Sequence, residues 1–366
     1  MVKGIYLHIP FCSYKCPYCD FLSFVEPQAS HEEYLQLLLK ELDLYKDLDF
    51  SLKTLYFGGG TPSLIKPKLY EDFIRKLSKG IDLSCLEEIS LEANPENYSF
   101  EEYKQLKGMG FNRISIGAQS LREEGLKVLG RLHSVGDTLR AVYNAHRAGF
   151  ENINIDLIYG YQGQSLRDLE KEIDLLKNLP LTHISLYLLT PYEDTQIGNL
   201  YKKGLLKLPD EDTIGDMYQL LVDKLSDMGF LHYEVSNFAL EGYECKHNLL
   251  YWTHEEFLGL GPSAWSFVKY RRFGNTRNLR LYKEGVLKGK KPVEYEEVLE
   301  GKEKIYDYIF VVLRTRKGVE KDLLPYLPED LKEFFEEEKG RLRLNTRGML
   351  LINEILLRLK GCIRHW

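Results

Sequence analysis

The sequence predicts an α/β protein: an incomplete (β/α)6-type barrel, then a C-terminal α+β extension and a small winged-helix-like module. Short apolar runs rich in β-branched and aromatic residues alternate with segments of helical periodicity, at 5–9, 54–57, 88–91, 113–116, 153–157 and 184–188. Such alternation implies parallel strands joined by right-handed crossovers. Polar or glycine-rich groups follow five successive strands, as expected where barrel strands converge on an active-site face.

Helix signals support the crossovers between these strands. The first predicted helix opens at Ser30, with Glu33 three residues later as a capping box. Another starts at Ser165 and carries an apolar stripe that suits the covering of a sheet, at 166, 169, 173 and 176. Only six units are visible before the pattern changes near Leu205, so the barrel is expected to be incomplete and open to a large substrate.

Three domains are predicted: the barrel at 1–205, the extension at 206–290 and the winged-helix-like module at 291–366. The extension begins with a helical stretch at 210–228, and the lysine-rich run at 283–291 predicts a solvated linker. The last region combines helical spacing at 305–312 and 351–359 with a short strand at 342–344. Its acidic run at 336–338 is unsuited to DNA, so packing or partner docking is the expected role.

Composition excludes several classes of function. Hydrophobic residues make up 44% and charged residues 28% of the 366, which is typical of a globular protein. The net charge is −6, from 49 basic and 55 acidic residues, without a long basic block, so neither a nucleic acid nor a membrane surface is an expected partner. Neither a transmembrane stretch nor a signal-peptide core is visible, which predicts a cytoplasmic protein.

Three cysteines crowd into one loop after the first strand: Cys12, Cys16 and Cys19. Three thiolates at this spacing are suited to hold a [4Fe–4S] cluster by three of its irons, leaving the fourth iron open to another ligand. A structural zinc site is the alternative, with His8 as its fourth ligand. The loop alone leaves both interpretations open.

The cysteine loop resembles that of the radical S-adenosylmethionine (SAM) superfamily, and Tyr6-Leu-His-Ile-Pro-Phe-Cys12 is similar to its oxygen-independent coproporphyrinogen oxidase branch, over nearly the whole chain. The resemblance implies a radical SAM barrel. It also implies a [4Fe–4S] cluster whose fourth iron is chelated by SAM. Zinc accounts only for the cysteines, whereas the cluster with SAM also accounts for the polar strand ends.

The resemblance implies SAM contacts at the strand ends. Gly59, Gly60 and Thr61 match the segment for the methionine amino group, and Arg131 is suited to the carboxylate. Gln119 and Asp156 match ribose contacts, and Glu92 would face the cationic end of the molecule. Tyr6 matches a residue beside the cluster. The structural alternatives are rim salt bridges for the carboxylates and a packing role for Tyr6; no catalytic residue is assigned.

Two features separate this chain from the oxidases. Phe21 occupies the position of a fourth cysteine, and only eleven residues precede Cys12, where the oxidases carry a longer segment. The run His247-Asn-Leu-Leu-Tyr-Trp252 fits the pattern of haem chaperones of the HemW type. That resemblance implies a protein that binds haem and hands it to acceptor haemoproteins, with His247 as an iron ligand and Cys245 as a second candidate.

Two hypotheses therefore stand. In the first, the protein is a haem carrier whose cluster and SAM serve reduction, gating or dimerisation. In the second, it is an enzyme that oxidatively decarboxylates coproporphyrinogen III or methylates a tetrapyrrole or other aromatic substrate. The resemblance adds further expectations: a ferredoxin or flavodoxin as electron donor, a homodimer, and membrane contact only through a partner.

Overall fold

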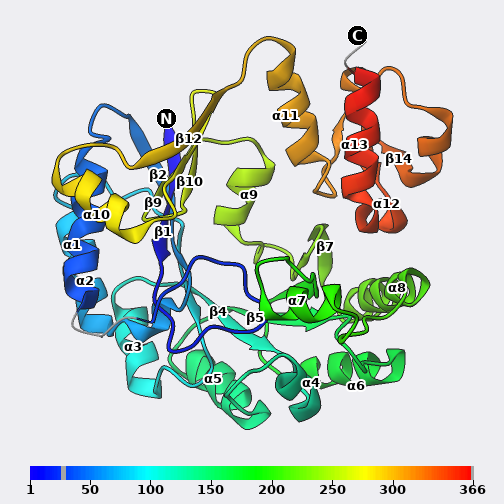
Figure 1. Ribbon diagram of the computed structural model, residues 1–366, viewed down its shortest axis with the longest axis horizontal. Helices are drawn as coiled ribbons and strands as arrows, with labels where there is room; N and C mark the ends of the chain where they lie inside the picture. Colours follow the sequence, from blue (N-terminus) through cyan, green and yellow to red (C-terminus); the bar gives the residue numbers. More distant parts are fainter. Residues whose placement is uncertain (26–29, 364–366) are drawn as a thin grey trace.

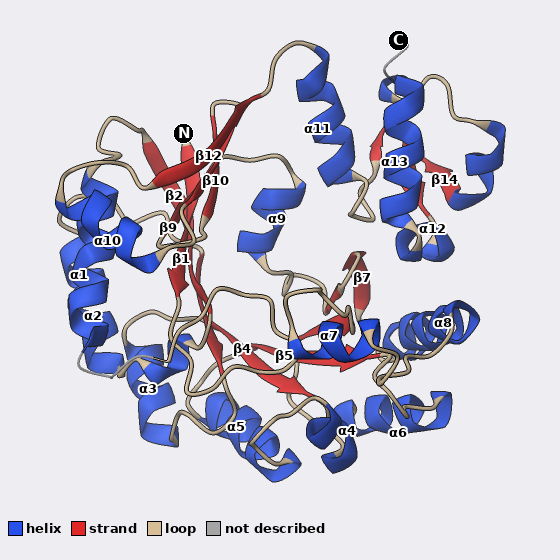
Figure 2. Ribbon diagram, in the orientation of Figure 1, coloured by secondary structure: helices blue, strands red, loops and turns tan. Residues whose placement is uncertain are grey.

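The structure is a computed structural model that describes residues 1–25 and 30–363. Six parallel strands form its centre and neighbour one another in chain order, as predicted (Figures 1 and 2). They are β1 (Val2–Ile9), β2 (Phe50–Gly59), β3 (Glu88–Ala93), β4 (Arg113–Gln119), β5 (Asn152–Tyr159) and β6 (His183–Leu188). The predicted α/β fold is confirmed, and these strands deliver the candidate site residues at their carboxyl ends.

Helices on the outer face of this sheet make the crossovers (Figure 2). They are α1 (Ser30–Asp43), α2 (Pro67–Leu77), α3 (Phe100–Gly108), α4 (Glu123–Val128), α5 (Val135–Arg147) and α6 (Leu166–Leu176). Capping boxes at Ser99, Ser134 and Ser165 fix the starts of α3, α5 and α6. The predicted stripe of α6 buries Leu169, Ile173 and Leu176 against the sheet, whereas its first member, Leu166, is exposed.

The part of the chain from residue 196 to residue 298 adds strands to both edges of the six-stranded sheet. Its elements are α7 (Gln196–Lys202), α8 (Glu211–Asp227), β7 (Leu231–Glu234), β8 (Asn237–Ala239), α9 (Lys246–Trp252), β9 (Phe257–Leu260), β10 (Trp265–Val268), β11 (Arg271–Asn275), α10 (Leu279–Leu287) and β12 (Val293–Val298). β9 pairs with β1 in parallel and is followed by β10, β11 and β12, while β8 and β7 lie beyond β6. The sheet thus continues past residue 290, where a domain boundary was predicted.

The lysine-rich run predicted as a linker is mostly helix. α10 covers Leu279–Leu287 and buries Tyr282 and Val286 among the core residues. The prediction was wrong because the buried face of α10 carries only two large apolar residues, so the exposed lysines dominated the pattern. Glu41 of α1 accepts a 2.5 Å hydrogen bond from the Tyr282 hydroxyl, which ties α10 to the first helix of the barrel.

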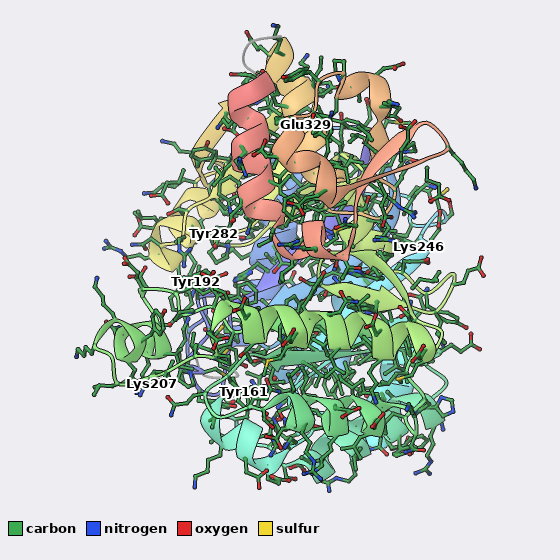
Figure 3. The ribbon with its side chains drawn as sticks, turned by 90° about the vertical axis from the view of Figure 1, so that its right-hand side faces the viewer. Tyr161, Tyr192, Lys207, Lys246, Tyr282 and Glu329 are labelled. Carbon is green, nitrogen blue, oxygen red and sulfur yellow. The ribbon has the colours of Figure 1, made fainter. Side chains whose placement is uncertain are left out.

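The last part of the chain holds α11 (Lys302–Val312), β13 (Val319–Glu320), β14 (Phe335–Glu338), β15 (Arg341–Leu344), α12 (Thr346–Leu350) and α13 (Ile352–Ile363). The three strands form a separate antiparallel sheet in the order β13-β15-β14. α11 contacts α9 and α12 contacts α8, and Figure 3 shows this part, marked by Glu329, above the barrel region marked by Tyr161. Its winged-helix-like character and the domain boundaries stay predictions. No helix in the described residues combines the length and apolar character needed to cross a membrane.

Candidate functional site

The cysteine loop leaves β1 and closes on itself through its backbone. Cys12 N donates to Phe24 O at 3.0 Å, and Phe24 N donates to Pro10 O at 2.6 Å. Within the loop, Cys19 N donates to Cys16 O at 3.2 Å. The three thiols are free and partly exposed. The loop therefore presents all three cysteines from one tethered segment at the end of the first barrel strand.

Polar donors point at two of the three sulfurs. Thr61 Oγ1 donates to Cys12 Sγ at 3.4 Å, and Arg131 Nη1 donates to Cys16 Sγ at 3.2 Å. Burial raises the pKa of Cys19, and the other two cysteines raise it further because they lie close by. Donors such as Thr61 and Arg131 can support the negative charge that a cysteine sulfur carries when it ligates iron. The donor set therefore fits an iron–sulfur cluster.

His8, the fourth ligand in the zinc alternative, is occupied elsewhere. Its Nδ1 lies 3.1 Å from the Tyr6 hydroxyl, and its Nε2 lies 2.9 Å from Leu22 O. Burial lowers the pKa of His8 to about 4, so the ring is neutral and uses one nitrogen as donor and the other as acceptor. With both nitrogens engaged, His8 does not complete a tetrahedral site with the cysteines.

The glycine-rich end of β2 packs directly against the cysteine loop. In the parallel register of β1 and β2, Gly59 lies opposite Ile9, and Gly60 N donates to Ile9 O at 2.8 Å. A Cβ at Gly60 would stand 2.7 Å from Phe11 O and 3.1 Å from Cys12 Sγ, so a side chain has no room there. This bare stretch of backbone is a cradle that gives a ligand access to peptide groups beside the cysteines.

Glu92 ends β3 beside this cradle. Its Oε2 accepts from Gly59 N at 3.0 Å and its Oε1 accepts from the Tyr56 hydroxyl at 2.8 Å. Burial raises the pKa of Glu92 to about 7, and the nearby Asp156 adds to the shift. With this pKa, Glu92 is only partly ionised near neutral pH. A cationic ligand beside it would stabilise the ionised form.

Arg131 follows α4 and reaches the cysteine loop. Its Nη2 donates to Asn94 Oδ1 at 2.8 Å and to Gly117 O at 3.2 Å, in addition to the contact with Cys16. Its Nε is buried and has no hydrogen-bond partner among the described residues. An arginine held at two nitrogens with a third N–H unused is oriented for a carboxylate ligand.

Gln119 is the last residue of β4, and Asp156 lies in the second half of the adjacent strand β5. Gln119 has φ 66°, an uncommon backbone conformation that accompanies a register shift between the two strands. Asp156 accepts from Ser115 Oγ at 3.0 Å and Asn154 Nδ2 at 2.8 Å, and burial raises its pKa. The structure thus brings both residues to the same end of the sheet as Glu92.

Tyr6 lies inside the barrel beside the other site residues. Its ring stacks on Tyr56, with centroids 6.1 Å apart, and on His247, with centroids 6.3 Å apart. Its hydroxyl is engaged with His8 Nδ1. Tyr6 therefore contacts neighbouring side chains of the site, and these contacts hold the rings of Tyr56, His247 and His8 in place.

His247 is fully buried, and both of its ring nitrogens have protein partners. Nδ1 lies 2.7 Å from Thr54 Oγ1, and Nε2 lies 2.8 Å from the Tyr251 hydroxyl. Burial lowers its pKa to about 3, so the ring is neutral. This geometry leaves no nitrogen for iron and does not support the haem-ligand role predicted for His247.

Glu88 anchors the segment that carries His247. Glu88 accepts from Lys246 N at 2.9 Å and from His247 N at 3.1 Å, and the Cys245 thiol points at it from 3.6 Å. Burial raises the pKa of Cys245 to about 12, so this thiol stays protonated. The motif is therefore docked against the start of β3, and Cys245 does not join the cysteine loop.

Three residues that hold predicted site residues in place were not predicted from the sequence. Each forms a hydrogen bond with one of them: Tyr56 with Glu92, Asn94 with Arg131, and Glu88 with His247. Asn94 follows β3 two residues after Glu92, and Tyr56 precedes the glycine segment by two residues, so strand alternation was an available signal for both. Glu88 offered no such signal because its partners are about 160 residues away.

The comparisons with known proteins show the family of this chain. The profile of the radical SAM superfamily matches residues 6–176. A heme chaperone HemW from Lactococcus lactis is 38% identical over 87% of this chain and 83% of its own length. Those from Bacillus subtilis and Escherichia coli are 34% and 32% identical, each over at least 96% of both chains.

Among solved structures, the coproporphyrinogen III oxidase HemN from Escherichia coli has a TM-score of 0.82 at 21% identity, over 97% of this chain and 89% of that one. At this identity the likeness shows a shared fold. The superfamily implies a [4Fe–4S] cluster and SAM as cofactors, which the donor set of the cysteine loop fits. With relatives above 30% identity along nearly its whole length, this chain belongs to the HemW family of radical SAM proteins.

Proposed function

We propose that this protein is a haem chaperone that binds haem and transfers it to acceptor haemoproteins. The observation that carries the proposal is the near full-length similarity to proteins named heme chaperone HemW, which spans the barrel, the extension and the C-terminal region alike. Phe21 in place of a fourth cysteine in the loop is a second argument against the oxidase alternative.

Cys12, Cys16 and Cys19 would hold the [4Fe–4S] cluster. Thr61 and Arg131 support the charge on the sulfurs of Cys12 and Cys16 through the hydrogen bonds described above. When bound, the reduced cluster would supply a single electron to the sulfonium group of SAM.

The strand ends would orient SAM over the cluster. The backbone at Gly59 and Gly60, with Thr61, would receive the methionine amino group, and Arg131 the carboxylate, through its unused Nε. Glu92 lies beside the cradle and would balance the positive charge of the amino or sulfonium group. Gln119, at the end of β4, and Asp156, in the second half of β5, would contact the ribose hydroxyls.

The proposed function requires a cargo, acceptor proteins and an electron donor. The cargo is haem, the acceptors are apo-haemoproteins, and the electron donor is a ferredoxin or flavodoxin. A homodimer and membrane contact through a partner belong to the same proposal. Tyr6 would brace the base of the SAM site through its stacking on Tyr56.

The decisive experiment runs two assays on one anaerobically reconstituted sample: a haem titration and a coproporphyrinogen III conversion with SAM and a reductant. We expect saturable haem binding, haem transfer to an apo-haemoprotein, and no protoporphyrinogen IX. Conversion of coproporphyrinogen III would establish the enzyme instead. A sample with full cluster content that binds no haem would refute the chaperone proposal.

A further inference from the structure

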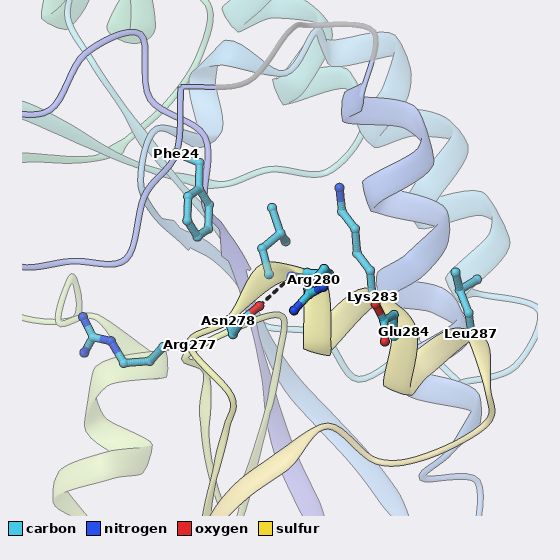
Figure 4. Close-up of a pocket in the computed structure, with 8 residues that line it drawn as sticks. Phe24, Arg277, Asn278, Arg280, Lys283, Glu284 and Leu287 are labelled. Atoms are coloured by element: carbon cyan, nitrogen blue, oxygen red, sulfur yellow. Dashed lines mark hydrogen bonds between the residues drawn. The ribbon is translucent and has the colours of Figure 1, made fainter.

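A pocket of about 670 Å³ lies between α10 and the cysteine loop (Figure 4). Its volume is within the range of small-molecule sites, about 300–1,000 Å³. One wall is Phe24, whose backbone closes the cysteine loop on Pro10 and Cys12. The remaining lining residues belong to α10 and the turn before it: Arg277, Asn278, Leu279, Arg280, Lys283, Glu284 and Leu287.

The pocket concentrates positive charge in a protein whose net charge is −6. Within the described part of the chain, Arg277, Arg280 and Lys283 form no ion pair with a carboxylate. Arg277 Nη2 instead donates to Asp20 O at 3.3 Å, one residue after Cys19. The single acid of the lining, Glu284, already lies 3.9 Å from Lys288. Three cations that have no acidic partner among the described residues, along one short segment, suit a ligand that carries more than one carboxylate.

The same pocket offers apolar surface to the body of a ligand. Phe24 and Leu279 are half-buried, and Leu287 is 63% exposed at the far end of the lining. Figure 4 shows the Phe24 ring facing the interior of the pocket from the loop side, opposite α10. An aromatic face and aliphatic side chains near Arg280 and Lys283 match a flat apolar ring system with anionic groups at its edge.

The lining has no residue that commonly ligates haem iron. None of the eight described residues that form it is histidine, cysteine, methionine or tyrosine. A haem held here would therefore be bound through its ring and its carboxylates, with the iron free of ligands from the lining. An acceptor protein with an axial histidine could then take the iron without displacing a ligand of the carrier.

We infer that the pocket between α10 and the cysteine loop is the cargo site, and that it binds a planar tetrapyrrole by its propionate groups. The inference rests on the proposed haem-carrier function and adds the location and the mode of binding. It assigns Arg280 and Lys283 to the propionates and Phe24 to the ring face. Arg277, held on the cysteine loop, links the cargo site to the candidate cluster site.

The test uses the full chain with its cluster reconstituted anaerobically, and the double variant Arg280→Glu/Lys283→Glu. Its matched control, Lys79→Glu/Lys104→Glu, makes the same charge change at exposed positions outside the lining. Each protein is titrated with haem, iron-free protoporphyrin IX, protoporphyrin IX dimethyl ester and coproporphyrin III. Iron content and circular dichroism check that the variants fold and carry the cluster.

We expect the pocket variant to bind haem roughly tenfold or more weakly, because two charge-assisted contacts become repulsive. The control should bind as the wild type does. Protoporphyrin IX should match haem in affinity, and its dimethyl ester should bind much more weakly. Weaker binding of coproporphyrin III than of haem would identify the two-propionate ring as the cargo, and tighter binding would overturn haem as the cargo of this pocket.

Wild-type protein that binds no haem would refute the chaperone proposal and the site together. Haem binding that survives in the pocket variant, or is insensitive to esterification, would refute the site and leave the chaperone proposal standing. Tight binding that requires iron would also overturn the inference, because the lining offers the metal no ligand.

Discussion

The imidazole of His247 stacks on the ring of Tyr56, with centroids 5.1 Å apart and planes inclined by 24°. The Tyr56 hydroxyl in turn donates to Glu92 at the edge of the candidate SAM site. The His-Asn-x-x-Tyr-Trp run is therefore joined to that site through Tyr56, and also through Tyr6, which stacks on both rings. In this arrangement His247 positions Tyr56, and through Tyr56 it positions Glu92.

Replacing His247 by alanine should weaken SAM binding and leave haem binding intact. The change removes the stack on Tyr56 and leaves the buried hydroxyl of Thr54 and the half-buried hydroxyl of Tyr251 without this partner. We expect the free energy of unfolding to fall by about 3–5 kcal/mol. The affinity for SAM should fall about fivefold, the equivalent of one lost hydrogen bond. Urea denaturation, equilibrium dialysis with SAM and a haem titration measure the three effects.

His247→Phe is the matched variant, because a phenyl ring keeps the stack and loses only the two ring nitrogens. It should retain most of the SAM affinity while the protein remains destabilised. If either variant lost haem binding and kept SAM binding, His247 would be an iron ligand and the positioning role would be wrong.

The six-strand pattern was predictable because short runs of β-branched and other apolar residues alternate with helical segments. In Ile153–Leu157 of β5, for example, apolar residues occupy every second position. The placement of polar residues such as Glu92 and Asp156 near the strand ends followed from the same pattern, whereas their assignment to a SAM site came from the resemblance to the radical SAM superfamily. The docking of His247 was not predictable. It depends on contacts with Thr54 and Glu88 from distant strands, which leave no local pattern in the sequence.

The affinity for SAM should rise with pH between about 6 and 8 if Glu92 balances its positive charge. Burial raises the pKa of Glu92 to about 7, so the ionised form that attracts a cation becomes dominant only above that value. Glu92→Gln should bind SAM more weakly at pH 8 and lose the pH dependence. Dialysis at several pH values measures both effects.

Exposed Glu124 supplies the control for this series, since Glu124→Gln removes a charge from α4 outside the site. Its affinity and pH profile should match those of the wild type. An unchanged pH dependence in Glu92→Gln would show that another group titrates and would remove Glu92 from the SAM contacts.

Replacing Cys16 by alanine should abolish the stable [4Fe–4S] cluster, because a cluster bound by two thiolates lacks one of its three protein ligands. Iron and acid-labile sulfide should fall well below four each per chain after anaerobic reconstitution. Cys85→Ala is the control, because Cys85 is exposed and remote from the loop. Full cluster content in Cys16→Ala would overturn the ligand assignment.

The buried Glu41 should make the stability of the fold depend on pH. This buried carboxyl accepts from the Tyr282 hydroxyl at 2.5 Å, Asn275 Nδ2 at 2.5 Å and Gly261 N at 2.8 Å, and so joins α1 to α10 and the added strands. Burial raises its pKa from 4.5 to about 7 despite these hydrogen bonds. Between these two pH values the folded protein holds a proton that the unfolded chain has released, so stability falls as the pH rises through this window.

Glu41→Gln should flatten this dependence, because an amide does not titrate. The free energy of unfolding, measured by urea denaturation from pH 5 to pH 8, should fall less steeply in the variant than in the wild type. A residual slope is expected from Glu92 and Glu234, whose pKa values burial also raises to about 7. Glu33→Gln, at an exposed position on the same helix, should keep the wild-type slope. Equal slopes for Glu41→Gln and the wild type would mean that Glu41 is ionised in the folded protein throughout this range.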